Sequence, residues 1–249
     1  MSNIKFDVKN LNLHYGKFHA LKDVNMEIPE KQITAFIGPS GCGKTTTLRI
    51  LGGFETPDTG KVLFNGQDIT QLPPNKRQLN TVFQKYALFS HLNVFENVAF
   101  GLLENQKMPR RQAREKAVEV LRQVGLGPDV ADLSPSELSG GMQKRVGLAR
   151  AVATRPEIIF FDEPTTGLDP IMADVINDLI IDSVKKLGAS ALTITHDMAS
   201  ARKIADRIAM LYQGKIIWQG TVAEMDKTDN PYVCQFVNGC SKGPIKVEV

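Results

Sequence analysis

A glycine-rich stretch, GPSGCGKTT at residues 38–46, constrains the fold of this chain more than any other segment. It lies between the apolar run ITAFI at 33–37, which predicts a strand, and the helix-like segment TTLRIL at 46–51. Four of its residues satisfy the pattern G-x-x-x-x-G-K-S/T, namely Gly38, Gly43, Lys44 and Thr45. Because glycines lack Cβ atoms, the backbone can wrap closely around an anion, and its N–H groups and the positive end of the helix both point at phosphate oxygens. The stretch therefore predicts a P-loop, a phosphate-binding turn between a strand and a helix.

The chemistry of this turn indicates ATP with Mg²⁺ as its ligand. Lys44 supplies a mobile cation for the β and γ phosphates, and the Thr45 hydroxyl is placed to ligate Mg²⁺. The rest of the loop is expected to contact the nucleotide as well, through Gly38, Pro39, Ser40, Gly41, Cys42, Gly43 and Thr46. The competing interpretation is an ordinary glycine turn at a helix start, which the strand before it and the helix after it disfavour.

The composition is that of a globular α/β protein with little net charge. The chain has 249 residues, 42% of them hydrophobic, and 30 Lys and Arg against 27 Asp and Glu give a formal charge of +3. This balance gives no reason to expect nucleic acid as a partner. Three cysteines, Cys42, Cys234 and Cys240, lack metal-ligand spacing and suit a reducing compartment. Because no apolar stretch reaches about 18 residues and the start lacks a signal peptide, we expect the chain in the cytoplasm.

Short apolar runs rich in β-branched and aromatic residues predict strands along the chain. They lie at 4–8, 24–28, 33–37, 61–64, 80–83, 158–161, 190–195, 207–212 and 215–218. Helical patterns separate several of them, which indicates a largely parallel sheet covered on both faces. The close pairs at 4–28 and 207–218 indicate antiparallel additions at an edge.

No strand signal occurs from about residue 94 to 155, so this segment is predicted to be an α-helical insert. Within it Pro109 opens a helix and Gly125 is the expected C-cap. The apolar stripe of that helix consists of Ala113, Ala117, Val118, Leu121 and Val124. Its charged residues indicate a solvated face rather than a nucleic-acid site. We expect one domain over 1–240, insert included, and a loose tail at 241–249.

Two adjacent carboxylates, Asp162 and Glu163, follow the apolar run IIFF at 158–161. Such a run predicts a buried parallel strand, and ligand sites lie at the carboxyl ends of these strands. Neighbouring strand residues point to opposite sides, so we expect the two carboxylates to have different roles. Asp162 is predicted to face the metal, and Glu163 to orient or deprotonate the water that attacks the γ-phosphate. The alternative is a pair of solvated carboxylates that opens a turn before Pro164.

A second glycine pair precedes a helix in LSGGMQKR at 138–145, where Ser139, Gly140 and Gly141 offer backbone amides to an anion. With this third element the sequence resembles a family. GPSGCGKTT, LSGGMQ, IIFFDE, TGLD at 166–169 and THD at 195–197 have the order and spacing of ATP-binding cassette (ABC) ATPases. The resemblance covers residues from about 4 to 240.

The resemblance implies a fold and further site residues. The fold is a P-loop NTPase with a mainly parallel sheet, an antiparallel β edge subdomain and an inserted α-helical subdomain. Tyr15 would stack on adenine, Gln84 would touch Mg²⁺ or the attacking water, and His196 would contact the γ-phosphate. Asp169, in the TGLD loop, joins the nucleotide-binding residues.

The resemblance also implies partners. Two cassettes would pair head to tail when ATP is bound, so that Ser139, Gly140 and Gly141 of one copy cap the ATP held by the other. Membrane permease subunits would provide the translocation path and receive contacts from the segment at 85–100. The chain would then lie in the cytoplasm at the inner face of the membrane.

The cargo is indicated less directly, because different parts of the chain resemble different subfamilies. Residues 10–47 resemble phosphate-importer ATPases, the middle resembles polyamine-type importers, and the part from 138 to the end resembles Mla/Mce-type phospholipid transport ATPases. The long C-terminal resemblance favours phospholipid. The alternatives are a phosphate or polyamine importer, an engineered or recombined cassette without a native cargo, and an ABC protein that acts on DNA or ribosomes.

Overall fold

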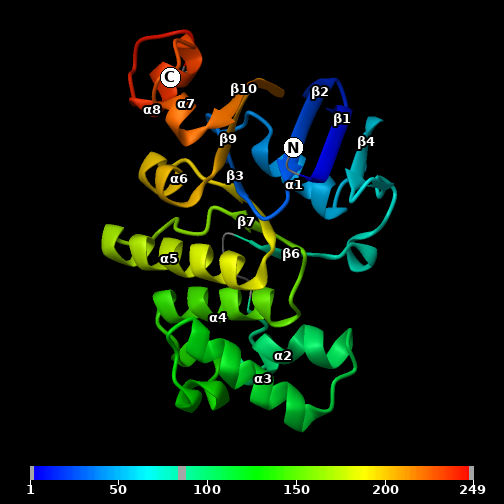
Figure 1. The fold of residues 1–249 in the computed structure, drawn as a ribbon, viewed down its shortest axis with the longest axis vertical. Coiled ribbons are helices and arrows are strands. Elements are labelled where there is room, and N and C mark those ends of the chain that lie inside the picture. Colours follow the sequence, from blue (N-terminus) through cyan, green and yellow to red (C-terminus); the bar gives the residue numbers. More distant parts are fainter. Residues whose placement is uncertain (1–2, 84–87, 247–249) are drawn as a thin grey trace. The chain divides into compact units, whose positions relative to one another are not determined.

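The computed structural model describes residues 3–83 and 88–246. The chain divides into two compact units (Figure 1). Unit 1 comprises Met1–Arg77 and Ser190–Val249, and unit 2 comprises Gln78–Ala189. Within the described ranges, no helix is both long enough and apolar enough to cross a membrane.

Unit 1 begins with an antiparallel sheet in the order β2-β1-β4-β5. Its strands are β1 (Ile4–Tyr15), β2 (Phe18–Pro29), β4 (Thr59–Phe64) and β5 (Gln67–Asp68). Antiparallel pairing of β1 with β2 confirms the expected hairpin, although it belongs to this separate sheet and not to the edge of the parallel one. Both strands extend beyond the predicted apolar runs. β-Bulges at Asn10 and Asp23, which have positive φ, keep β1 and β2 paired across the polar residues between those runs. Phe6 pairs with Phe64 and Val8 with Val62, which gives this sheet a buried face.

A second set of strands in unit 1 has the order β10-β9-β3-β8. It contains β3 (Ile33–Ile37), β8 (Ser190–Ile194), β9 (Arg207–Tyr212) and β10 (Lys215–Thr221). β3 is buried throughout and runs parallel to both β8 and β9, as the apolar run predicts. β10 pairs antiparallel with β9 through the turn at Gln213 and Gly214, both with positive φ, which confirms the predicted terminal hairpin.

Four helices complete unit 1: α1 (Lys44–Gly52), α6 (Met198–Ile204), α7 (Val222–Met225) and α8 (Pro231–Val237), with a 3-10 turn at Pro74–Lys76. Within the predicted tail, residues 241–243 are exposed, but the prediction of a loose segment is wrong at Ile245, which is buried. Ile245 N–H donates to Gln235 Oε1 at 2.7 Å, and Gln235 Nε2 donates to Ile245 O at 3.1 Å, so a buried amide side chain pairs with the returning backbone.

Unit 2 carries the helical insert and two parallel strands, β6 (Leu79–Val82) and β7 (Ile158–Asp162). Its helices are α2 (Val94–Glu104), α3 (Arg110–Gln123), α4 (Gly140–Ala153) and α5 (Pro170–Leu187), with 3-10 turns at Pro128–Asp132 and Pro135–Glu137. The apolar stripe predicted for α3 is correct except at one position. Val118 is only partly buried and Val120 is buried instead.

Candidate functional site

The P-loop has the conformation that its glycines predict. Gly38 follows β3 with φ +139°, and a Cβ there would lie 2.1 Å from the Leu211 carbonyl oxygen. Gly43 has φ +113° and precedes α1, and a Cβ there would lie 2.7 Å from Leu21 Cδ2. Both positions combine positive φ with a neighbour too close for any side chain, so only glycine fits. The loop backbone is thereby held at the amino end of α1, where N–H groups are available to an anion.

Lys44 is folded onto the loop that precedes it. Its side chain is buried, and Nζ donates to Gly38 O at 2.6 Å, to Pro39 O at 2.9 Å and to Cys42 Sγ at 3.6 Å. The ammonium therefore lies at the centre of the loop, held by carbonyl oxygens. Burial raises the pKa of the Cys42 thiol, and the Lys44 ammonium opposes that rise. A phosphate group carries more negative charge than these carbonyl oxygens, so it would compete with them for the Lys44 ammonium.

The other end of α1 is anchored by a buried arginine. Arg77 Nη1 donates to Ile50 O at 2.8 Å and to Leu51 O at 2.7 Å, and its Nε donates to Leu72 O at 2.8 Å. The first two carbonyls belong to the last turn of α1, where no N–H group follows within the helix, and Ile50 O also accepts from Gly53 N at 3.0 Å. Burial lowers the pKa of Arg77 to about 10. The arginine thus holds the helix whose amino end carries the P-loop.

A cavity of about 450 Å³ lies beside the P-loop in unit 1. One wall is the loop from Pro39 to Cys42, and another is the start of β2 from Phe18 to Ala20. Tyr15 is the cross-strand partner of Phe18, so the two rings lie on one face of the hairpin end. They are 46% and 64% exposed, which leaves aromatic surface beside a phosphate-binding loop. Tyr15 Oη donates to Glu55 Oε2 at 3.3 Å.

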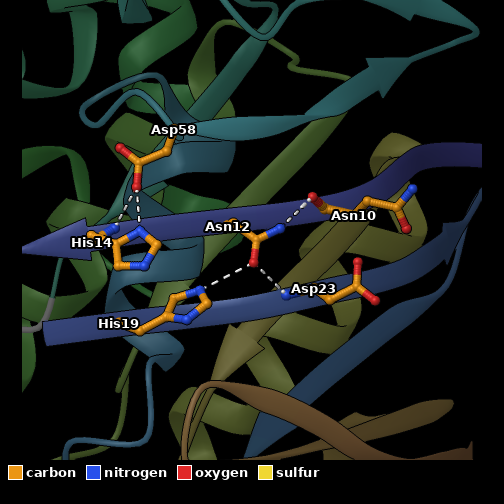
Figure 2. A network of polar contacts seen from close by, with 6 residues as sticks. All are labelled: Asn10, Asn12, His14, His19, Asp23 and Asp58. Atoms are coloured by element: carbon orange, nitrogen blue, oxygen red, sulfur yellow. Dashed lines mark hydrogen bonds and ion pairs between the residues drawn. The ribbon is translucent and has the colours of Figure 1, made fainter.

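A polar network braces the hairpin behind Tyr15 (Figure 2). His14 donates through its backbone N–H and through Nδ1 to Asp58 Oδ2, at 2.7 Å in each case. His14 also stacks on His19, with ring centroids 3.9 Å apart. Asn12 Oδ1 lies 3.1 Å from His19 Nε2 and accepts from Asp23 N at 3.0 Å. These bonds join β1, β2 and the turn before β4, and so position the end of the hairpin.

His196 follows β8 in the same unit. β3 and β8 are parallel with Phe36 opposite Ile194, so the P-loop and His196 leave the sheet at the same edge. Asp197 caps α6, because its carboxylate accepts from Ala199 N at 3.0 Å and from Ser200 Oγ at 2.6 Å. The cap holds the loop that carries His196.

In unit 2, Asp162 ends β7 and Glu163 turns the chain away from it. Glu163 has φ +50°, a left-handed conformation that costs a residue with a side chain about 1–2 kcal/mol. Its Oε2 accepts from Thr166 Oγ1 at 3.0 Å, and its carbonyl accepts from Thr166 N at 3.3 Å. We call residues 163–166 the carboxylate turn. Since strain of this kind concentrates at functional sites, the turn is a candidate for catalysis.

Two helix starts in unit 2 carry the remaining predicted residues. Ser139 caps α4 by accepting from Met142 N at 3.3 Å, and Gly140 begins the helix. A Cβ added to Gly140 would meet no atom of the described residues within 4 Å, whereas one added to Gly141 would lie 2.8 Å from Met172 Cε. Asp169 caps α5 by accepting from Ile171 N and Met172 N, both at 3.0 Å.

The predicted site residues therefore fall into three groups. Unit 1 holds the P-loop, Tyr15 and His196, whereas unit 2 holds Asp162, Glu163, Asp169 and the Ser139–Gly141 segment. Gln84 lies outside the described residues. Sequence reasoning assigned no role to Thr166 or Phe18. Thr166 could have been found as a hydroxyl three residues after Glu163, and Phe18 as an aromatic residue close to Tyr15 in the predicted hairpin.

Comparison with known proteins places these motifs in one family. Residues 21–166 match the family model described as ABC transporter. The chain belongs to the ABC transporter family. It is 41% identical over 92% of its length to the sulfate/thiosulfate import ATP-binding protein CysA of Neisseria meningitidis. It is also 40% identical over 94% to the spermidine/putrescine import ATP-binding protein PotA of Clostridium acetobutylicum. The chain spans 65% and 66% of the length of these two relatives.

Solved structures confirm the ABC ATPase fold for this family member. The dimeric structure of MJ0796, a bacterial ABC transporter cassette, superposes with a TM-score of 0.79 at 32% identity and covers 87% of this chain and 98% of its own. CbiO1 from Clostridium perfringens, part of the transporter complex cbiONQ, gives 0.81 at 30% identity with 96% of each chain covered. The expected combination of parallel strands, an antiparallel sheet and a helical insert is thus correct.

Proposed function

We propose that this chain binds and hydrolyses ATP and thereby drives an ABC transporter. The observation that supports this most directly is the P-loop, where Gly38 and Gly43 admit no side chain and the Lys44 ammonium is held by carbonyls of the same loop. The loop backbone and Lys44 bind the phosphates, Tyr15 stacks on adenine and His196 contacts the γ-phosphate. Glu163 takes the proton of the attacking water as the water oxygen bonds to the γ-phosphorus and the bond to the bridging oxygen of ADP breaks.

The donor groups available suit Mg²⁺. Among the described residues no group of three or more His, Cys, Asp and Glu could hold a metal alone. Mg²⁺ commonly keeps several waters and uses one or two protein groups together with substrate phosphates, so the Thr45 hydroxyl, the Asp162 carboxylate and the Gln84 amide are sufficient ligands. When bound, Mg²⁺ neutralises charge that develops on the phosphates.

We further propose that two copies pair head to tail around ATP and work on membrane permease subunits at the cytoplasmic face of the membrane. In this pairing Ser139, Gly140, Gly141 and Asp169 of one copy complete the nucleotide site of the other. Within the described part of the chain, a Cβ added to Gly140 meets no atom within 4 Å, and this space supports a ligand or partner beside that residue. The MJ0796 cassette is itself described as dimeric, which supports pairing of its relatives.

The cargo proposal follows the resemblance of the C-terminal half to phospholipid transport ATPases. The CysA, PotA and FbpC relatives are instead named for import of sulfate or thiosulfate, polyamines and ferric ion, so small-solute import is the competing proposal. Purification of the chain with candidate permeases from detergent extracts, followed by mass spectrometry, tests both. Recovery with a lipid-transport permease supports the first, and recovery with a solute permease supports the second.

Glu163→Gln tests the catalytic proposal. The variant keeps the shape of the side chain but cannot take up a proton, so steady-state turnover should fall at least about 100-fold while nucleotide binding persists. Turnover is measured as phosphate release and binding with a fluorescent ATP analogue. Gel filtration of the same variant with ATP should show about twice the monomer mass. Turnover equal to that of the unmodified chain would remove Glu163 from the proposed role.

A further inference from the structure

We propose that Thr166 and Lys144 are positioning residues that hold the Glu163 carboxylate for catalysis. This inference rests on the role proposed above for Glu163. Thr166 Oγ1 donates to Glu163 Oε2 at 3.0 Å, and Thr166 N donates to Glu163 O at 3.3 Å. One residue thus holds both the side chain and the backbone of Glu163, and the carboxylate has a defined orientation at the end of β7.

Lys144 holds the carboxylate turn from α4. Its Nζ donates to Thr166 O at 2.6 Å and to Pro164 O at 3.2 Å. The lysine is half-buried, and burial lowers its pKa. A hydrogen bond from an ammonium in such a place is stronger than one at the surface, because water competes less well for the donor. Lys144 therefore restrains the two carbonyls that flank Thr165.

The turn needs such restraint because its backbone is strained. Glu163 has φ +50°, and a residue of this kind keeps that conformation only where its surroundings enforce it. Loss of either donor would let the turn relax and the carboxylate move. A misplacement of about 1 Å in a reacting group costs about 100-fold in rate.

Lys144 also lies beside a second anchor on the same helix. Gln143 Nε2 donates to Pro135 O at 3.0 Å and to Leu138 O at 3.4 Å, and so holds the segment before Ser139. Neighbouring residues of α4 therefore hold the segment before Ser139 and the carboxylate turn. Movement of the amino end of α4 would be transmitted to Glu163 through Lys144.

Thr166→Val tests the inference, because it removes the hydroxyl and keeps the shape of the side chain. We expect kcat to fall about 10-fold to 100-fold, with the KM for ATP within about twofold of the unmodified chain. Thr166→Ser restores the hydroxyl and should return kcat to within about threefold. Lys144→Met should lower kcat in the same way, whereas Lys186→Met, at an exposed position on α5, should leave it unchanged.

The contradicting outcomes are distinct. An unchanged kcat in Thr166→Val, or a loss that Thr166→Ser does not restore, overturns the positioning role. In a Glu163→Gln background, Thr166→Val should not lower the residual single-turnover rate further. A further loss of the same size would show that Thr166 acts independently of Glu163, and would also overturn the inference. Full turnover in Glu163→Gln alone would instead refute the proposed function of Glu163, and binding of the fluorescent ATP analogue shows that each variant is folded.

Discussion

The backbone conformation of the P-loop in unit 1 depends on glycines, whereas the carboxylate turn of unit 2 is held by one of its own side chains and by a lysine from α4. In the loop, Gly38 and Gly43 adopt positive φ and pack directly against neighbouring atoms. In the turn, Glu163 adopts positive φ with a side chain present, and Thr166 and Lys144 offset the cost through hydrogen bonds. In the P-loop, substitution of Gly38 or Gly43 adds an atom where a neighbour already lies. In the carboxylate turn, single substitutions can remove one hydrogen bond at a time.

The largest expected effect separates the glycines of the two units. Gly38→Ala places a Cβ 2.1 Å from the Leu211 carbonyl, a backbone atom that cannot move away alone. We expect the free energy of unfolding to fall by more than about 3 kcal/mol, or the chain to fail to fold. Gly140→Ala meets no atom within 4 Å and should change stability by less than about 1 kcal/mol. Urea unfolding measures both, and equal losses would contradict the comparison.

Buried Lys44 and half-buried Lys144 provide the next contrast. Lys44→Met removes the ammonium at the centre of the P-loop, so affinity for ATP should fall at least about tenfold, which is about 1.4 kcal/mol. Lys144→Met leaves the loop intact and should change that affinity by less than about twofold. Titration with a fluorescent ATP analogue measures the difference. A strong loss of affinity in Lys144→Met would show that the carboxylate turn contributes to binding as well as to turnover.

The smallest expected effect concerns the pH dependence of the stability that the His14–Asp58 hydrogen bonds give to the hairpin of β1 and β2. Hydrogen bonds from His14 hold the pKa of Asp58 below its usual value. A carboxyl with a lowered folded-state pKa stabilises the fold above its unfolded-state pKa, and this contribution is lost as pH falls through the folded-state value. Over the pH range at and below the ordinary pKa of aspartate, the unmodified chain should therefore lose stability more steeply than Asp58→Asn. Urea unfolding across this range checks the slope, with Asp229→Asn as a control of the same chemistry. If the free energy of unfolding fell equally steeply with pH in the unmodified chain, Asp58→Asn and Asp229→Asn, the His14–Asp58 interaction would not contribute to the pH dependence of stability.

Much of the fold could be predicted from the sequence because its signals are local. Residues 158–161 are apolar at every position and 33–37 at every position except Thr34, and each run forms a buried parallel strand. The helical insert follows from periodicity, with an error only at Val118 and Val120. That error arose because the packing of α3 against other helices of unit 2, which the periodicity alone does not define, decides which face is covered. The packed end of the chain was missed for the same reason, since a buried Gln235 decides the position of Ile245.

The sequence by itself predicted the P-loop, because the glycines in the pattern at 38–46 permit the positive-φ backbone conformations that the turn adopts. It also predicted Asp162 and Glu163 at the end of a strand. Only the tertiary structure decided how Glu163 is oriented, because Lys144 reaches the turn from a different helix. The same holds for the hairpin of Tyr15, since Asp58 and His14 are 44 residues apart in the chain. Contacts of this kind depend on which elements pack together, and local sequence propensity does not predict them.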